Sequence, residues 1–181
     1  MRSQLLATEI FGNTCWSSME ASCAIHACEG RGAAQAMILY HYTAVEYLDA
    51  IRREGLTLGD IPISPTEAQN AVWLTTSRDS AGHGLTEERQ LTIHEKRLLG
   101  HPIDSDKRFP NKRRIRIAVR ILASDKRLVK WRIWSAKRID AKWRKRLEDT
   151  AGGAEKAKTW WLYWDTISPS QFVEVVDLHQ K

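Results

Sequence analysis

The stretch "MILYHYTAVEYLDAIRREGLTLGD", residues 37–60, contains the first strand and the first helix expected of this fold. Residues 38–42 are aromatic, β-branched or apolar, a composition typical of a buried strand. Thr43 is positioned to cap the helix that follows, with Glu46 three residues later as its capping-box partner. Gly55 stands where a left-handed residue would end that helix.

Later segments predict further strands and helices. Residues 113–122, "RRIRIAVRIL", alternate apolar and charged side chains, which predicts a half-buried strand with one face in solvent. Three further strands are expected at residues 71–77, 159–167 and 171–178. Residues 126–150 are expected to form two helices broken near Ser135, and residues 151–158 a flexible loop. Strands with helices between them, without regular βαβ alternation, indicate an α+β fold.

The opening segment differs from the rest of the chain. Cys15, Cys23 and Cys28 lie there beside His26, with seven and four residues between the cysteines, spacings that fit no zinc pattern. We therefore expect no metal, and interpret residues 1–36 as a poorly ordered leader without function. Clear periodic patterns begin near Met37, which could itself be the natural start.

Residues 37–181 are expected to form a single domain. No run approaches 18 apolar residues, which predicts that the chain does not span a membrane. The opening segment lacks the compact apolar stretch of a signal peptide, which favours a cytoplasmic protein.

Charge is distributed unevenly. Residues 107–146 contain 17 Lys or Arg and two acids, Asp125 and Asp140, although the whole chain carries a net charge of only +6. Such asymmetry can attract polyanions, and Trp131, Trp134 and Trp143 within it could stack on exposed bases. The alternative is that these tryptophans pack into a core and the cations are simply solvated. The candidate residues for a nucleic acid or other acidic target are Arg114, Arg116, Arg120, Lys130, Arg132 and Trp134.

His41 stands in the middle of a predicted buried strand. A histidine there is more often a core residue with its hydrogen bonds satisfied than a functional one. Thr43, two residues later, lies on the same side of an extended chain. An imidazole beside a hydroxyl suits a ribose diol or a carboxamide. The sequence contains no P-loop and no GxGxxG fingerprint, so a nucleotide would be held in another way.

The motifs "LYHYT", "EGL" and "AVWLTTSRDSAGHG" together resemble the front half of the ADP-ribosyltransferase-like superfamily. This group includes the poly(ADP-ribose) polymerases, the RNA 2′-phosphotransferases and DNA-modifying toxins that use NAD. The resemblance covers residues 38–85 and, more weakly, residues 160–178. It implies a split β-sheet core with flanking helices, and we interpret the basic segment at about residues 123–158 as a helical insertion.

The resemblance also implies roles for individual residues. His41 and Thr43 would hold the ribose and amide of the nicotinamide end of NAD, and Trp73 would occupy a position that is more often tyrosine. Ser80 and His83 would contact nicotinamide, and Tyr42 would flank the site. Glu174 would act with His41 as the catalytic pair, by stabilising positive charge at the ribose. Gln171 lies three residues before Glu174, whereas many members of the family have Gln or Glu two residues before the catalytic Glu.

These features lead to one main hypothesis and two principal alternatives, beside a degenerate member of the fold that binds a nucleotide or a partner protein. The main hypothesis is an NAD-dependent ADP-ribosyltransferase-like enzyme that uses no metal and modifies nucleic acid or a nucleic-acid-associated target. One alternative is an NAD-dependent RNA 2′-phosphotransferase-like enzyme, which would need arginines to grip the phosphate, with Arg52, Arg53 and Arg78 as candidates. The other is a basic nucleic-acid-binding module without catalysis, which would bind DNA or RNA in a salt-sensitive manner.

Overall fold

A computed structural model describes residues 35–179 of the chain. The expectations for the leader, including Cys15, Cys23, Cys28 and His26, therefore lie outside the described residues, apart from its last two positions. The elements follow one another in this order: β1 (Ala36–Thr43), the 3₁₀ helix η1 (Val45–Tyr47), α1 (Leu48–Glu54), β2 (Gly59–Pro62), β3 (Ala68–Thr75), β4 (Arg89–Gln90), α2 (Ile93–Leu98), β5 (Arg108–Phe109), β6 (Ile115–Leu122), β7 (Leu128–Lys130), α3 (Trp131–Arg138), α4 (Ala141–Thr150), α5 (Gly153–Ala157), β8 (Trp160–Tyr163), the 3₁₀ helix η2 (Pro169–Gln171) and β9 (Phe172–Asp177).

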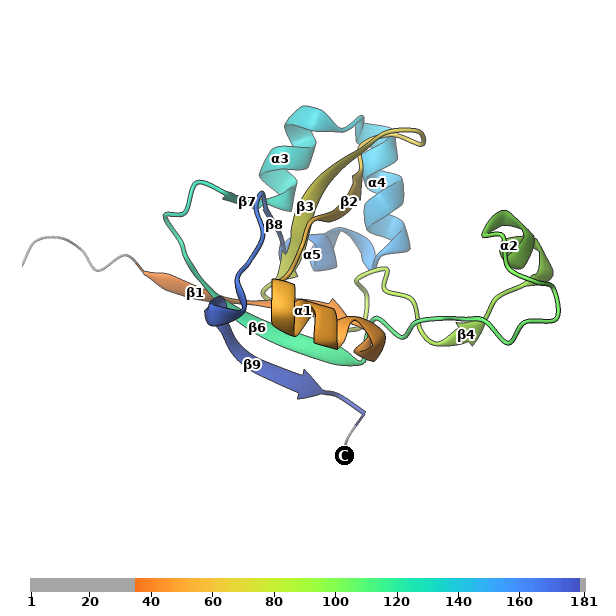
Figure 1. Cartoon of the computed structure of the whole chain (residues 1–181). Coiled ribbons are helices and arrows are strands. Elements are labelled where there is room, and N and C mark those ends of the chain that lie inside the picture. The colour runs from red at the N-terminus through yellow and green to blue at the C-terminus, as the bar shows by residue number, and fades with distance from the viewer. Residues whose placement is uncertain (1–34, 180–181) are drawn as a thin grey trace, which may run out of the picture. The chain divides into compact units, whose positions relative to one another are not determined.

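The main sheet has the strand order β7-β8-β3-β1-β6-β9, and β2 pairs with β3 beside this path. Every strand pair in it is antiparallel. Figure 1 shows α1 lying across β1 and β6, while α3, α4 and α5 gather around β2 and β3. The predicted α+β class is confirmed.

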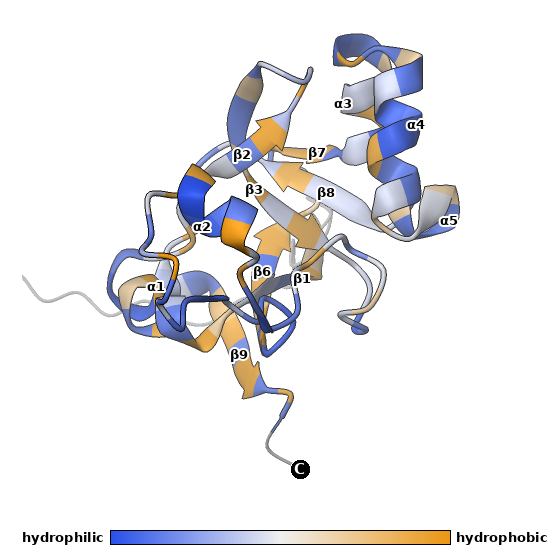
Figure 2. Ribbon diagram, turned by 90° about the vertical axis from the view of Figure 1, so that its right-hand side faces the viewer, coloured by the Kyte–Doolittle hydropathy of each residue, from blue (hydrophilic) through white to orange (hydrophobic). Residues whose placement is uncertain are grey.

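Two hydrophobic cores form on this sheet. The first joins β1, β3 and β6 to α1, whose Leu48 and Ile51 pack against this cluster. The second joins β2, β3 and β8 to the helices α3, α4 and α5 and is rich in tryptophan. The hydrophobic segments concentrate on β1, β3, β6 and β9, whereas α4 is largely hydrophilic (Figure 2). The predicted strand in residues 113–122 is confirmed as β6.

From the alternation, we expect the face of β6 that carries arginines to lie in solvent. In the structure this face is partly covered. Ala118 on that face is 3% exposed and packs with Tyr40 and Tyr42 of β1. Leu85 and Leu178 cover this third, small cluster. Alternation in one strand cannot reveal this cover, because the cover comes from loops distant in sequence.

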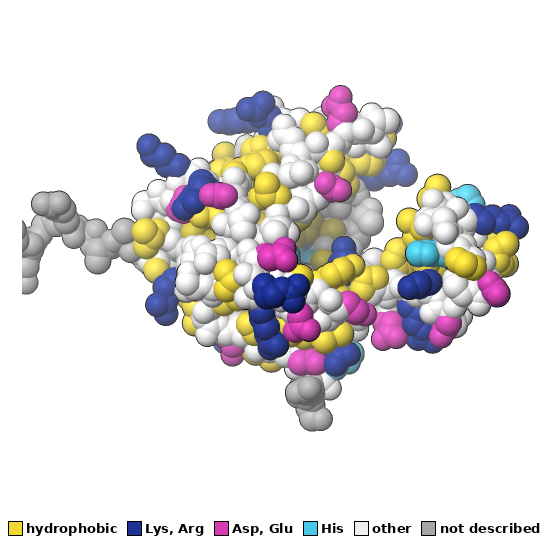
Figure 3. All heavy atoms as spheres, viewed as in Figure 1, with side chains coloured by type: hydrophobic (Ala, Val, Ile, Leu, Met, Phe, Trp, Pro, Cys, Tyr) yellow, Lys and Arg dark blue, Asp and Glu magenta, His cyan; other side chains and the backbone are white. Residues whose placement is uncertain are grey.

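Residues 86–111 form an arm between β3 and β6 that contains β4, α2 and β5. The space-filling view shows the arm as a lobe standing apart from the body (Figure 3). The arm exposes four large aliphatic side chains: Ile93, Leu98, Leu99 and Ile103. Its base is closed by a hydrogen bond of 3.0 Å from the backbone N–H of Lys112 to the carbonyl oxygen of Thr86.

Two local predictions about helix boundaries are wrong. Thr43 caps no helix, because it is a buried strand residue paired with Ile115, and the short helix η1 begins only after Ala44. The helices do not break at Ser135, which is completely buried within α3. They break at Asp140, whose carboxylate accepts hydrogen bonds from the first N–H groups of α4.

The predicted loop at residues 151–158 also needs correction, because it contains the short helix α5. Gly152 and Gly153 both have positive φ and turn the chain between α4 and α5. The residues that follow them are good helix formers, and this part of the segment is helical. None of the helices in the described range has the length and apolar character needed to cross a lipid bilayer.

Gly55 is essential to the junction between α1 and the sheet. It ends α1 with φ 88° and ψ −174°, so its φ is positive as predicted, but its backbone is not left-handed helical. Beside it, Leu56 and Ile167 exchange two backbone hydrogen bonds of 2.9 and 3.0 Å, and both side chains are buried. A Cβ at position 55 would lie 2.3 Å from the carbonyl oxygen of Ile167.

We expect Gly55→Ala to lower the free energy of unfolding by about 3 kcal/mol, through backbone strain and displacement of this bridge. Gly100→Ala is the matched control, because Gly100 also has positive φ but no atom lies within 4 Å of an added Cβ. The control should cost only about 1 kcal/mol. Urea denaturation of the two variants measures the difference, and equal losses would show that the Leu56–Ile167 contact is unimportant.

Candidate functional site

A cavity opens where β1 and β3 diverge. The two strands pair only at Tyr40 and Thr75, while β1 pairs with β6 along its whole length. The cavity has a volume of about 570 Å³, within the range of pockets that bind small molecules and cofactors. Its lining comes from β1, β2, β3, the loop after β3, the base of the arm, α3, α4 and β8: Tyr40, His41, Tyr42, Thr43, Tyr47, Gly59, Asp60, Pro62, Trp73, Leu74, Thr75, His83, Gly84, Leu85, Lys112, Trp131, Trp143, Arg146, Leu147, Thr150, Ala151 and Trp160.

His41 bridges the gap between the diverging strands. Its Nδ1 lies 2.9 Å from the carbonyl oxygen of Trp73. A carbonyl only accepts hydrogen bonds, so Nδ1 carries the proton. Desolvation by burial lowers the pKa of His41, so the ring is neutral at pH 7. Its Nε2 is therefore an acceptor, and no described residue donates to it.

His83 has the opposite tautomer, and both of its ring nitrogens are occupied. The indole N–H of Trp160 donates to Nδ1 at 2.9 Å, and Nε2 donates to the carbonyl oxygen of Asp79 at 3.0 Å. Burial lowers the pKa of His83 to about 4. The ring stacks on Tyr42 with centroids 5.7 Å apart. His83 is therefore an aromatic wall of the cavity and cannot exchange protons while these bonds remain.

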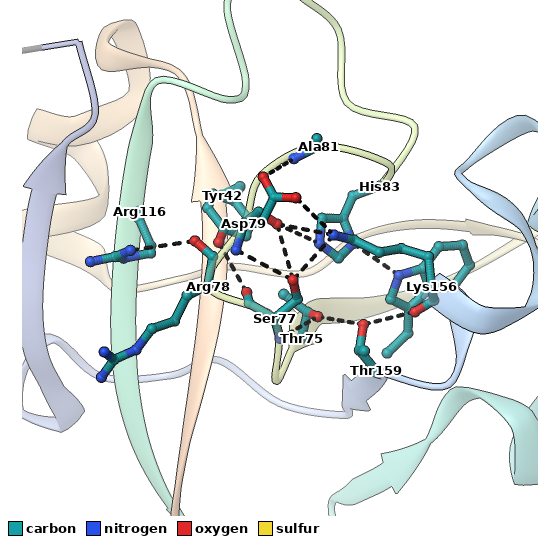
Figure 4. Close-up of polar contacts among 11 residues, drawn as sticks. Tyr42, Thr75, Ser77, Arg78, Asp79, Ala81, His83, Arg116, Lys156 and Thr159 are labelled. Atoms are coloured by element: carbon teal, nitrogen blue, oxygen red, sulfur yellow. Dashed lines mark hydrogen bonds and ion pairs between the residues drawn. The ribbon is translucent and has the colours of Figure 1, made fainter.

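The loop that carries His83 is held from both sides (Figure 4). Lys156 of α5 contacts Ser77 Oγ at 3.1 Å and the carboxylate of Asp79 at 3.5 Å. From β1, the hydroxyl of Tyr42 donates to the carbonyl oxygen of Ser77 at 3.0 Å. Burial raises the pKa of Tyr42 to about 12, which keeps this donor protonated. The loop position thus depends on β1 as well as on α5.

Tryptophans form the floor of the cavity. The ring of Trp73 lies 5.0 Å from that of Trp131 and 5.8 Å from that of Trp160, centroid to centroid. Trp131 is completely buried and donates its N–H to Glu148 at 3.0 Å. It packs in the core and cannot stack on the bases of a nucleic acid, which corrects that interpretation for Trp131. Trp134 is half-buried between Trp131 and Trp164.

The structure brings together five of the six residues predicted to bind a cofactor. His41, Tyr42, Thr43, Trp73 and His83 line the same cavity. The hydroxyl of Thr43 has no hydrogen-bond partner in the described part of the chain, so it is available to a ligand. The sixth residue, Ser80, belongs to the half-buried part of the loop and does not line the cavity.

Glu174 is not brought to the cavity. Residues directly opposite in a sheet project to the same face, and Glu174 is opposite Ala118, which is opposite Tyr40. His41 is opposite Ile117 and projects from the other face. A register shift between Ala118 and Val119 produces this arrangement. The carboxylate of Glu174 is 51% exposed and lies 3.3 Å from the guanidinium of Arg116.

The predicted target-binding residues do not form one surface. Arg114, Arg116 and Arg120 lie on or next to β6, whereas Lys130 ends β7, and β8, β3 and β1 lie between those strands. Arg114 is paired with Asp177 and Arg116 with Glu174, while Arg120 is exposed. Lys130 lies over the ring of Trp161. Arg132 and Trp134 are on α3, beside β7.

Sequence reasoning missed several residues of the cavity. Lys112 and Arg146 are its two cationic side chains, and Asp60 is the one carboxylate among the described lining residues. Trp160 determines the tautomer of His83. The chain brings these residues together from the arm, α4, β2 and β8, so only the run "TWWLYW" gave a signal, and it indicated a strand rather than a site.

Comparisons of the chain with protein-family models, with curated proteins and with solved structures gave no match.

The buried neutral state of His83 makes stability depend on pH. Its pKa is about 4 in the folded protein and about 6.5 when unfolded, so the unfolded chain binds more protons between these values. This contribution to stability is complete above pH 6.5 and is lost as the pH falls towards 4. His83→Asn keeps an acceptor for Trp160 but does not titrate.

We expect the loss of unfolding free energy between pH 6.5 and pH 4 to be about 1 kcal/mol smaller in this variant than in the parent, a value reduced for solvent screening of a partly exposed ring. Urea denaturation at a series of pH values measures it. If the unfolding free energy falls with pH equally in the two proteins, His83 is not held neutral.

Proposed function

We propose that the cavity binds NAD and that the protein is an ADP-ribosyltransferase-like enzyme. One observation carries the proposal. His41, Thr43, Trp73 and His83, which motif resemblance alone assigned to a nicotinamide site, line one cavity although they span more than 40 residues of sequence. His41 Nε2 and the Thr43 hydroxyl have no described partner, and they lie beside aromatic walls that suit a flat pyridinium ring.

The chemistry required of such a cavity is modest. Nicotinamide is already a good leaving group, so the protein must hold the nicotinamide riboside and stabilise positive charge as the glycosidic bond breaks. Neutral His41 would accept a hydrogen bond from a ribose hydroxyl or from the carboxamide. Lys112 and Arg146, at the same cavity, could balance the two negative charges of the pyrophosphate.

The carboxylate that assists departure of nicotinamide has two candidates. Motif resemblance assigns it to Glu174 of β9. This residue is paired with Arg116 and projects from the face of the sheet opposite to His41. Asp60 is the carboxylate that lines the cavity. We expect at least one of the variants Glu174→Gln and Asp60→Asn to lose ADP-ribosyl transfer about 100-fold while still binding NAD. Full transfer activity in both would contradict this mechanism.

NAD binding itself is tested at His41. His41→Asn retains a side-chain N–H for the carbonyl oxygen of Trp73 but removes Nε2, so we expect NAD to bind at least about tenfold more weakly, with little change in Tm. Calorimetric titration measures the affinity, and His94→Asn, on the exposed arm, is the control. Unchanged affinity in His41→Asn would contradict the proposal, and unfolding would identify His41 as a core residue.

The reaction is tested by incubating the protein with NAD labelled in its adenylate part and with DNA, RNA or protein acceptors. Incorporation of label supports ADP-ribosyl transfer. Loss of phosphate from 2′-phosphorylated RNA would instead identify an RNA 2′-phosphotransferase. Salt-sensitive nucleic-acid binding that survives His41→Asn, without NAD binding, would leave only the non-catalytic module.

A further inference from the structure

Two arginines flank the ring of Tyr40 on the side of β1 away from His41. The guanidinium carbon of Arg116 lies 5.5 Å from the ring centroid and that of Arg78 lies 5.7 Å from it. Arg116 also approaches the carbonyl oxygen of Arg78 at 3.4 Å. Figure 4 shows both guanidinium groups pointing to the same side, away from the loop network of Asp79 and His83.

The charges of this pair are incompletely neutralised. Arg116 is paired with Glu174 at 3.3 Å, a long contact to a carboxylate that is 51% exposed. Arg78 has no carboxylate within ion-pairing distance in the part of the chain that the structure describes. Its Nε donates to the hydroxyl of Tyr40 at 2.6 Å, which leaves its two terminal nitrogens without described partners. The Nε of Arg116 is buried and also unpartnered.

The supporting structure holds both groups in place. Tyr40 is 6% exposed and belongs to the small cluster with Tyr42 and Ala118, so its ring is a fixed base for the guanidiniums. Arg116 and Glu174 project from the paired strands β6 and β9. Arg78 is the exposed member, but its Nε is fixed on the Tyr40 hydroxyl. Preorganised donors of this kind lose little side-chain entropy when an anion binds.

We propose that Arg78 and Arg116 form a phosphate-binding site and that Glu174 occupies part of it when no ligand is bound. A phosphate group offers several acceptor oxygens and up to two negative charges, which suits two guanidiniums better than a single carboxylate does. The site is separate from the cavity and does not depend on NAD binding. Because Tyr40 also lines the cavity, a phosphate bound here would lie one side chain away from it.

Binding of a fluorescent single-stranded oligonucleotide, measured by anisotropy at several salt concentrations, tests the site. We expect Arg78→Gln to weaken binding about tenfold and to reduce the slope of log affinity against log salt by about 0.7, the value for one phosphate contact on a single strand. Arg120→Gln is the matched control, because Arg120 is an exposed arginine on the same strand β6 as Arg116 and outside this cluster. It should change affinity less than twofold.

Glu174→Gln provides a test of opposite sign. Removing the competing carboxylate should strengthen binding at least about threefold, whereas a merely structural Arg116–Glu174 pair would give no gain or a loss. Titration with inorganic phosphate distinguishes the source of the ligand. Displacement of the oligonucleotide at low millimolar phosphate, dependent on Arg78, indicates a site for small phosphates, and the absence of displacement indicates a polynucleotide backbone.

Equal effects of Arg78→Gln and Arg120→Gln, or no binding of either probe, would overturn the proposal. Weaker binding by Glu174→Gln would also overturn it. The His41→Asn variant separates this site from the NAD proposal, because it should bind the oligonucleotide like the parent protein. Loss of NAD binding with intact Arg78-dependent anion binding, or the reverse, shows which of the two proposals fails.

Discussion

The opening of β1 away from β3 is the constraint on which the rest of the site depends. Strands that diverge leave backbone groups without ladder partners, and such groups must be satisfied by other means. Two neighbouring side chains of β1 do this for the end of β3 and the loop after it, and a third, Tyr40, bonds the side chain of Arg78. His41 donates to the carbonyl oxygen of Trp73, Tyr42 donates to that of Ser77, and Tyr40 accepts from Arg78. The polar residues that interrupt the apolar strand thus hold the cavity open while fixing its far wall.

The same constraint gives the two histidines of the cavity different chemistry. Each ring is neutral, because burial lowers both pKa values, but their hydrogen-bond partners select opposite tautomers. His83 uses both nitrogens within the protein and contributes a flat, rigid surface. His41 uses one nitrogen to bridge the diverging strands, and its other nitrogen has no partner among the described residues. A neutral imidazole acceptor and a free hydroxyl among aromatic walls suit the recognition of a planar group better than acid–base chemistry.

Local periodicity predicted the parts of this structure that depend on local information. The alternation in residues 113–122 predicted β6, and the aromatic strand around His41 predicted β1, because the side-chain period of a strand is two. Five of the six residues predicted to bind a cofactor line one cavity, and they lie in two short motifs. Glu174 shows where such reasoning fails. One register shift beside Ala118 moves Glu174 to the opposite face from His41, and no local pattern announces a single extra residue.

Charge shows the same limit in a different form. The basic run at residues 107–146 suggested one electropositive surface, but antiparallel pairing separates its members across the sheet and pairs Arg114 and Arg116 with acids of β9. Arg78, which has no carboxylate partner among the described residues, lies outside that run. The guanidinium groups of Arg78 and Arg116 both lie over the ring of Tyr40. The register that keeps Glu174 out of the cavity also places its carboxylate 3.3 Å from Arg116. The arginine pair and the cavity thus share Tyr40 of β1, and the arginines lie on the side of that strand away from His41.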